Sequence, residues 1–83
     1  MQIKHMETQT LIDRITITPG LMGGKPTIRE LRFPVSDIFE MLASGMTVAA
    51  ILEQHPILEA QDIQAAMLYA SLKLKNTAII NAA

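Results

Sequence analysis

The chain contains no cysteine and no tryptophan, and its only aromatic residues are Phe33, Phe39 and Tyr69. Without cysteine there is neither a disulfide framework nor a thiolate site, so a reducing, cytoplasmic location is the default expectation. Because apolar residues make up 49% of the chain and aromatic residues only 4%, the core must be built from Ile, Leu, Ala and Met. That composition favours helices, and we therefore expect a mostly helical protein.

Long apolar runs are also missing from the sequence. No run of about 18 consecutive apolar residues occurs, and no basic segment followed by an apolar run stands at the N-terminus, so we expect neither a membrane span nor a signal peptide. The two histidines, His5 and His55, lie far apart, and no metal-binding cluster is indicated. At 83 residues the chain is expected to form one domain with a small core, for which help from a partner is reasonable.

Positive charge is absent from the middle of the chain. Between Phe33 and Leu72 there is no Lys or Arg, whereas the same block contains five acidic residues, Asp37, Glu40, Glu53, Glu59 and Asp62. The basic residues precede or follow this block, and the formal net charge is −1. Because sequence-independent binding of nucleic acid depends on neutralising phosphates, this balance argues against that class of function.

The N-terminal part of the sequence predicts an arm followed by a small β-sheet. Residues 1–13 show no clean period and are predicted as a flexible or partner-docked arm. In residues 14–18 polar and apolar side chains alternate and nearly all are β-branched, a pattern that is typical of a short strand. After a glycine-rich turn region, residues 27–33 have the pattern of a tight hairpin around Arg29 and Glu30, although such turns usually prefer Gly, Asn or Asp.

Three helices are predicted after this sheet. Ser36 and Asp37 begin the first helix, which Gly45 ends as a left-handed cap. Thr47 is predicted to cap the second helix, which ends before Pro56, and the third helix is predicted over residues 60–75. We expect residues 14–75 to form a single domain of three helices with a small N-terminal β-hairpin sheet, followed by an apolar C-terminal tail over residues 76–83.

An ordered series of short motifs resembles the domain-of-unknown-function 433 family. The series begins with the hairpin segment of residues 23–35 and continues through residues 42–47, 51–56 and 62–70. Members of that family are small bacterial and archaeal proteins with a β-hairpin before a helix-turn-helix-like trio of helices, and they are often regarded as antitoxins encoded beside nuclease-like toxins of the PIN type. The resemblance therefore implies a mostly α, helix-turn-helix-like three-helix bundle and an antitoxin-like role for this chain. The positions that depart from the family pattern are Glu30 in place of Gly, Leu31 in place of Thr, and Glu59 in place of a capping Ser or Thr.

Two sets of residues are candidates for DNA contact. In a helix-turn-helix, the third helix presents its N-terminal side chains to base edges, where Gln61 and Gln64 have amides suited to adenine. The negative charges of Glu59 and Asp62 oppose this placement because they would face the phosphates. The alternative is that Gln61 and Gln64 belong to a solvated polar face of a core helix. The hairpin provides the second set, Lys25, Arg29 and Arg32. For these residues the alternative is structural, with Arg32 paired to Asp37 or another acid of the first predicted helix.

Catalysis, cofactors and metals have little basis in the sequence. The carboxylates are spread over predicted helix surfaces, and no Ser lies at a recognisable spacing from a His. Gly23-Gly24-Lys25 lacks the spacing and the following Ser or Thr of a phosphate-binding loop. Asp37 and Glu40 could share a metal ion, but both also fit an exposed helical face. We therefore expect no enzyme, no cofactor, no metal site and no small-molecule substrate.

The predicted third helix is apolar around more of its circumference than one core contact requires. Its main stripe consists of Ile63, Ala66, Met67, Ala70 and Leu74. Further apolar residues, which we predict as a protein interface, are Leu68, Tyr69 and Leu72 on other faces of the helix and Ile79 and Ile80 in the tail. The alternative is the ordinary exposure of scattered hydrophobic residues. We expect a homodimer.

Two hypotheses of function follow from the residues and the family resemblance. The first is a non-catalytic antitoxin-like module that binds a nuclease-type toxin through its C-terminal helix and tail, with its own promoter DNA as a further partner. The second is a homo-oligomeric interaction domain without affinity for nucleic acid, which the acidic helices favour. A steep dependence of DNA affinity on salt would distinguish the first from the second.

Overall fold

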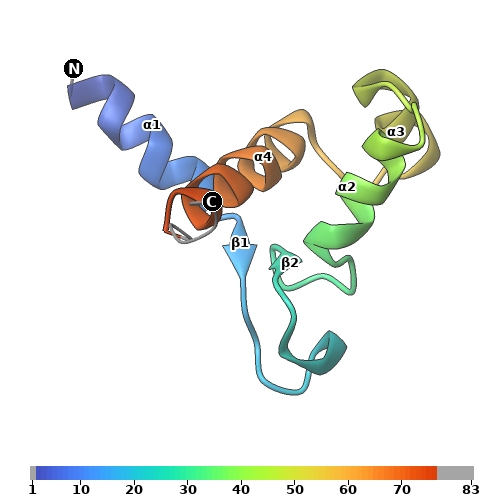
Figure 1. Cartoon of the computed structure of the whole chain (residues 1–83), viewed down its shortest axis with the longest axis horizontal. Helices are drawn as coiled ribbons and strands as arrows, with labels where there is room; N and C mark the ends of the chain where they lie inside the picture. Colours follow the sequence, from blue (N-terminus) through green and yellow to red (C-terminus); the bar gives the residue numbers. More distant parts are fainter. Residues whose placement is uncertain (1, 77–83) are drawn as a thin grey trace, which may run out of the picture.

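The computed structural model of the chain describes residues 2–76, with side chains from residue 7 onward. Within these residues the fold is mostly helical, with one small antiparallel sheet, as the sequence predicts (Figure 1). The elements in chain order are α1 (Gln2–Ile12), β1 (Ile15–Thr16), the 3-10 helix η1 (Met22–Gly24), β2 (Thr27–Ile28), α2 (Val35–Ala43), α3 (Val48–Gln54) and α4 (Ala60–Lys75). No described helix is long and apolar enough to cross a membrane.

The segment predicted as a flexible or partner-docked arm, residues 1–13, contains a helix in the structure. Helix α1 occupies most of this segment and lies against α4 (Figure 1). Among the side chains of α1 that the structure describes, those of residues 7–10 are exposed and those of Leu11 and Ile12 are half-buried. The sequence of α1 carries no apolar stripe, so the contact with α4 provides stabilisation that the local pattern does not reveal.

The β-sheet is shorter than predicted, and its strands pair differently. β1 and β2 are antiparallel, with Ile15 opposite Ile28 and Thr16 opposite Thr27. The expected second arm of the hairpin, residues 31–33, does not form a strand. The predicted tight turn around Arg29 and Glu30 is nevertheless present, because the Leu31 N–H donates to the Ile28 carbonyl at 2.7 Å. The chain then returns beside β2, where the Ile28 N–H donates to the Phe33 carbonyl at 3.1 Å and Thr27 forms an isolated antiparallel bridge with Pro34.

The predicted helix boundaries agree closely with α2, α3 and α4. Gly45 has a φ of +99°, and its N–H donates to the Leu42 carbonyl, as expected for a left-handed residue after a helix. The Thr47 hydroxyl accepts the Ala50 N–H at 3.0 Å and caps α3. Helix α4 spans the predicted residues 60–75.

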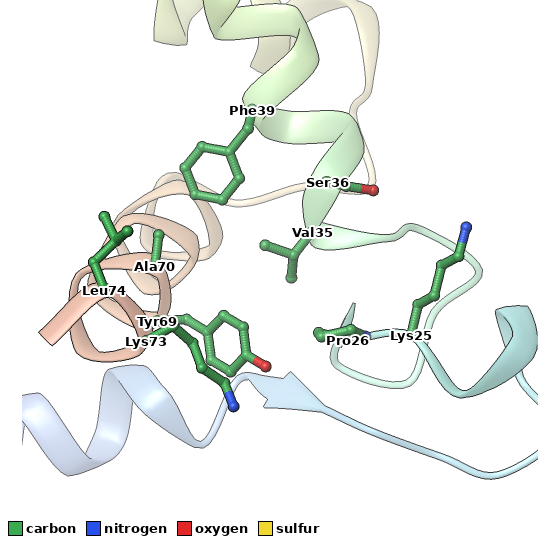
Figure 2. A pocket seen from close by; sticks show the side chains of 9 residues that line it. All are labelled: Lys25, Pro26, Val35, Ser36, Phe39, Tyr69, Ala70, Lys73 and Leu74. Carbon is green, nitrogen blue, oxygen red and sulfur yellow. The ribbon is translucent and has the colours of Figure 1, made fainter. Parts of the chain in front are cut away.

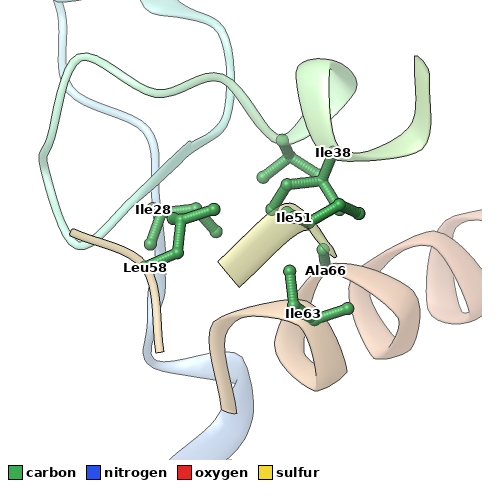
Figure 3. Packing of buried hydrophobic residues seen from close by; sticks show 7 residues of the cluster. Ile28, Ile38, Ile51, Leu58, Ile63 and Ala66 are labelled. Carbon is green, nitrogen blue, oxygen red and sulfur yellow. The ribbon is translucent and has the colours of Figure 1, made fainter. Parts of the chain in front are cut away.

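One hydrophobic core joins the sheet to the three helices. Its fully buried side chains come from β2, α2, α3, the loop before α4, and α4 itself, as the labelled members in Figure 3 show: Ile28, Ile38, Ile51, Leu58, Ile63 and Ala66. These residues are aliphatic, as the composition requires. The core lies against the first half of α4, so the second half of that helix extends beyond it.

Candidate functional site

The first notable feature is a cluster of charged side chains at the N-terminus of α4. The side chain of Asp62 is completely buried, and both of its oxygens accept hydrogen bonds. Arg29 donates to Asp62 through Nε at 3.1 Å and through a terminal nitrogen at 2.8 Å, while Arg14 donates at 3.0 Å. Arg14 also pairs with the exposed Glu59 at 2.7 Å. The cluster ties β1 and the turn after β2 to α4.

The charge of Asp62 is stabilised despite its burial. Burial alone raises the pKa of this carboxyl group, but hydrogen bonds from Arg29, from the Glu59 backbone N–H and from Arg14 outweigh that effect. The pKa of Asp62 is therefore held below its ordinary value. The hydrogen bond from the Glu59 N–H to Asp62 is 2.8 Å long and satisfies a backbone donor at the start of α4. Asp62 therefore helps to cap α4, whose first flanking residue is Glu59 in place of the Ser or Thr of the family pattern.

The turn that presents Arg29 is strained. Arg29 and Glu30 have φ values of +46° and +60°, a region that residues with side chains adopt at a cost of about 1 kcal/mol or more. The Arg29 N–H donates to the Arg14 carbonyl at 2.8 Å, and the Glu30 N–H donates to the Thr16 hydroxyl, also at 2.8 Å. These bonds, together with the ion pairs of Arg29, hold a turn that would ordinarily contain glycine.

The structure separates the residues predicted for DNA contact. Arg29 is engaged in the internal cluster, whereas Lys25 and Arg32 are exposed and lie in different surface pockets. Gln61 and Gln64 are both exposed on the first two turns of α4. The ion pairs that join sheet to helix therefore come from Arg14 and Arg29, and not from Arg32 as the structural alternative expected.

Arg32 lies beside acidic residues but forms no ion pair with any residue in the described range 2–76. It contributes to an open pocket of about 450 Å³ whose other lining residues are Phe33, Asp37, Glu40, Met41, Ser44 and His55. The rings of Phe33 and His55 meet edge to face with centroids 5.2 Å apart. Within the part of the chain that the structure describes, no three His, Cys, Asp or Glu residues are grouped so that they could hold a metal ion.

The second notable feature is an apolar groove between α2 and the C-terminal half of α4, which we call the α2–α4 groove. Its larger part has a volume of about 590 Å³, and Figure 2 shows Phe39 and Val35 on α2 facing Tyr69, Ala70 and Leu74 on α4. A second hollow of about 560 Å³ continues along α4 and shares Phe39, Ala70 and Leu74 with the first. Leu74 is 73% exposed, so a large apolar side chain borders the groove without being covered.

The groove only partly matches the interface predicted from the sequence. Tyr69 lines it, but Leu68 and Leu72 do not, and Ile79 and Ile80 lie outside the described residues. Sequence reasoning assigned the stripe containing Ala70 and Leu74 to the core. The length of the apolar stripe could have indicated the groove, because the stripe continues to Leu74, two turns beyond Ala66, where the buried core on α4 ends.

Comparisons with known proteins give matches that cover most of the chain. A family model described as "Protein of unknown function (DUF433)" matches residues 15–70. The uncharacterized protein y4eO of Sinorhizobium fredii is 39% identical over 56 residues, which are 68% of this chain and 25% of that protein. The crystal structure of a DUF433 member protein from Anabaena variabilis is similar with a TM-score of 0.71 and 31% identity, covering 90% of this chain and 74% of that one.

Proposed function

We propose that this chain, which belongs to the DUF433 family of proteins of unknown function, is a non-catalytic module that binds a partner protein in its α2–α4 groove. The observation that carries this proposal is the unfilled apolar surface of the second half of α4. Leu74 and Met67 are 73% and 44% exposed, and burying such side chains is worth about 1.5–3 kcal/mol each. A stable interface needs a few anchors of this kind near its centre.

The partner that the family resemblance supports is a nuclease-type toxin of the PIN kind, which makes the role antitoxin-like. The groove supports a partner-binding role because α4 presents exposed apolar side chains there, although Tyr69 is the one described residue of the predicted interface that lines it. A binding module requires no catalytic group, which agrees with the proposed non-catalytic role.

The matched pair Leu74→Ala and Leu72→Ala tests the proposal. Both variants shorten a leucine on α4, but only Leu74 borders the groove. The nuclease to use is a PIN-type protein encoded beside the gene for this chain, with affinity measured by calorimetry and inhibition measured by RNA cleavage. Leu74→Ala should weaken binding about tenfold, whereas Leu72→Ala should leave it unchanged. Equal losses in both variants, or no binding by the parent chain, would refute the proposed site.

Self-association is a second candidate for the same surface. The exposed Leu74 lies beside the hollow that Phe39 and Ala70 line, so a knob and a hole occur on one face, which a two-fold dimer requires. Light scattering over a range of protein concentrations tests this candidate. A dimer that Leu74→Ala dissociates would support a homo-oligomeric interaction domain, and a monomer at high concentration would exclude it.

Promoter DNA is a further partner within the antitoxin-like role. Gln61 and Gln64 are exposed, and Asp62, which was expected to oppose phosphates beside them, is buried and paired with two arginines. A titration of upstream duplex at low salt should show sequence-specific affinity that is lost in Gln61→Ala and Gln64→Ala. Binding that is absent at low salt would remove DNA from the proposed role.

A further inference from the structure

We infer that the occupant of the α2–α4 groove is an amphipathic helix whose apolar face is flanked by carboxylates. This inference rests on the proposed function and names the chemistry of the partner segment. It depends on three properties of the groove: the kind of backbone that forms its walls, the arrangement of its two hollows, and the sign of the charges at its rim.

The walls of the groove favour a helical occupant. They are formed by α2, α4 and the short segment that includes Pro26, which has no backbone N–H to donate. None of the described residues that line either hollow belongs to a strand, so these walls offer no strand edge with which an extended peptide could pair. An occupant buried there must satisfy its own backbone hydrogen bonds, and a helix does this.

The two hollows of the groove fit successive anchors of one helix. They adjoin along α4 and share Phe39, Ala70 and Leu74 as their common boundary. Apolar side chains one turn apart, at positions i and i+4, lie on the same face of a helix about 5–6 Å from each other. One such side chain would enter the hollow beside Tyr69, and the next would enter the hollow beside Met67.

Charge is segregated sharply around the groove. All lysines whose side chains the structure describes line it: Lys25 and Lys73 at the larger hollow and Lys75 at the second. None of the described residues that line either hollow is acidic. Figure 2 shows Lys25 and Lys73 on separate sides of the larger hollow, and the Lys73 nitrogen lies 5.6 Å from the centre of the Tyr69 ring.

This arrangement makes the groove a basic region on an otherwise acidic helical surface. Arg14 and Arg29 are paired within the Asp62 cluster, and Arg32 lies in a pocket with Asp37 and Glu40. A segment that carries Asp or Glu beside its apolar anchors is therefore attracted to the groove, and a basic segment is repelled. Rim charges of this kind contribute to specificity and to association rate more than to total affinity.

Three synthetic helical peptides of the same length test the inference. All three carry Leu at positions i, i+4, i+7 and i+11, and they differ only in whether the flanking residues are Glu, Gln or Lys. Each peptide is titrated into the full-length, isotope-labelled chain, with binding followed by amide chemical shifts and by fluorescence anisotropy. We expect the Glu peptide to shift Phe39, Ala70 and Leu74 and to bind at least tenfold more tightly than the Lys peptide.

Charge-reversal variants provide the matched control. Lys25→Glu and Lys73→Glu should each weaken the Glu peptide about threefold to fivefold and strengthen the Lys peptide. Arg32→Glu changes the net charge by the same amount but lies outside the groove, so it should leave both affinities nearly unchanged. Equal weakening by all three variants would show that net charge alone is sensed, which contradicts the inference.

The remaining outcomes separate this inference from the proposed function. If the three peptides bind the groove equally, the groove is a docking site but its preference for carboxylates is refuted. If none binds while the nuclease still binds in a Leu74-dependent manner, the helical occupant is refuted and the proposed function stands. If a dimer forms that Leu74→Ala dissociates and the Glu peptide fails to displace, a second copy of the chain is the occupant and the inference is wrong.

Discussion

Replacing Asp62 with Asn removes the charge at the centre of the ion-pair cluster while almost preserving the size of the side chain. The parent carboxylate is fully buried and accepts three hydrogen bonds from Arg29 and Arg14 and one from the Glu59 backbone N–H. Asn retains one acceptor oxygen, but it places an amide NH₂ group against guanidinium donors. Among the described residues these donors keep the exposed Glu59 carboxylate, for Arg14, and the Ile57 carbonyl, for Arg29, as acceptors. Asp62→Asn should therefore destabilise the folded chain strongly.

The size of this effect follows from the exposure of the partners. Breaking a buried ion pair by removing one member costs about 3–5 kcal/mol. The side chains of Arg14 and Arg29 remain 24% and 33% exposed, so water can partly solvate them after the change. We therefore expect a loss near the lower limit, about 3 kcal/mol. Such a loss is a large part of the total for so small a domain, because stability amounts to about 0.05–0.15 kcal/mol per residue.

The pH dependence gives an independent test of the same reasoning. Because the folded pKa of Asp62 lies below its unfolded value, its contribution is fully present above about pH 3.9 and is lost as pH falls through the folded pKa. Urea unfolding of the parent chain and of Asp62→Asn is measured from neutral pH down into the acid range. The difference between their free energies of unfolding should become smaller below about pH 3.9. Asp37→Asn, on an exposed helix face, is the control and should change stability by less than about 0.5 kcal/mol. If the two free energies of unfolding are equal at neutral pH, or if their difference does not depend on pH, this account of the cluster is refuted.

Three further predictions concern the local structure around the sites. Glu30→Gly should stabilise the chain by about 1 kcal/mol because Gly adopts the positive φ at this turn without strain, and urea unfolding that shows no gain would contradict the strain. Thr47→Ala should lower the free energy of unfolding by about 1 kcal/mol because the cap of α3 is lost, whereas Thr47→Ser should retain most of the stabilisation by the cap, as thermal unfolding of both variants would show. Ile51→Val should cost about 0.5–1.5 kcal/mol because Ile51 is fully buried, whereas Ile57→Val, at a residue that is 55% exposed, should be close to neutral in the same urea assay.

Features that depend on neighbouring residues were predictable from the sequence alone. The limits of α4, the cap at Thr47 and the left-handed residue Gly45 all follow from side chains within a turn or two of each other. The aliphatic core follows from composition, because few aromatic residues are available to fill it. The motif series identified the family, which the family model over residues 15–70 confirms.

Features that depend on distant residues were decided by the tertiary structure. Arg14, Arg29 and Asp62 lie far apart in the chain, and only the folded arrangement places two guanidinium groups on one buried carboxylate. Arg29 was a candidate for DNA contact because Lys25, Arg29 and Arg32 lie close together in the hairpin, and the alternative of internal ion pairs named only acids of the first predicted helix as partners. The local pattern did not indicate Asp62, which lies across the fold.

Helix α1 and the α2–α4 groove also depend on contacts between distant parts of the chain, so the sequence did not predict them. Helix α1 has no apolar stripe of its own, and its helical form depends on packing against α4. The apolar stripe of α4 was visible in the sequence, but a periodic pattern does not state how much of a helix its neighbours cover. By itself the sequence determined where α2, α3 and α4 lie and which family the chain resembles, since those depend on local chemistry. Only the tertiary structure decided which charges are neutralised and which apolar surface stays open, because burial is a property of the whole fold.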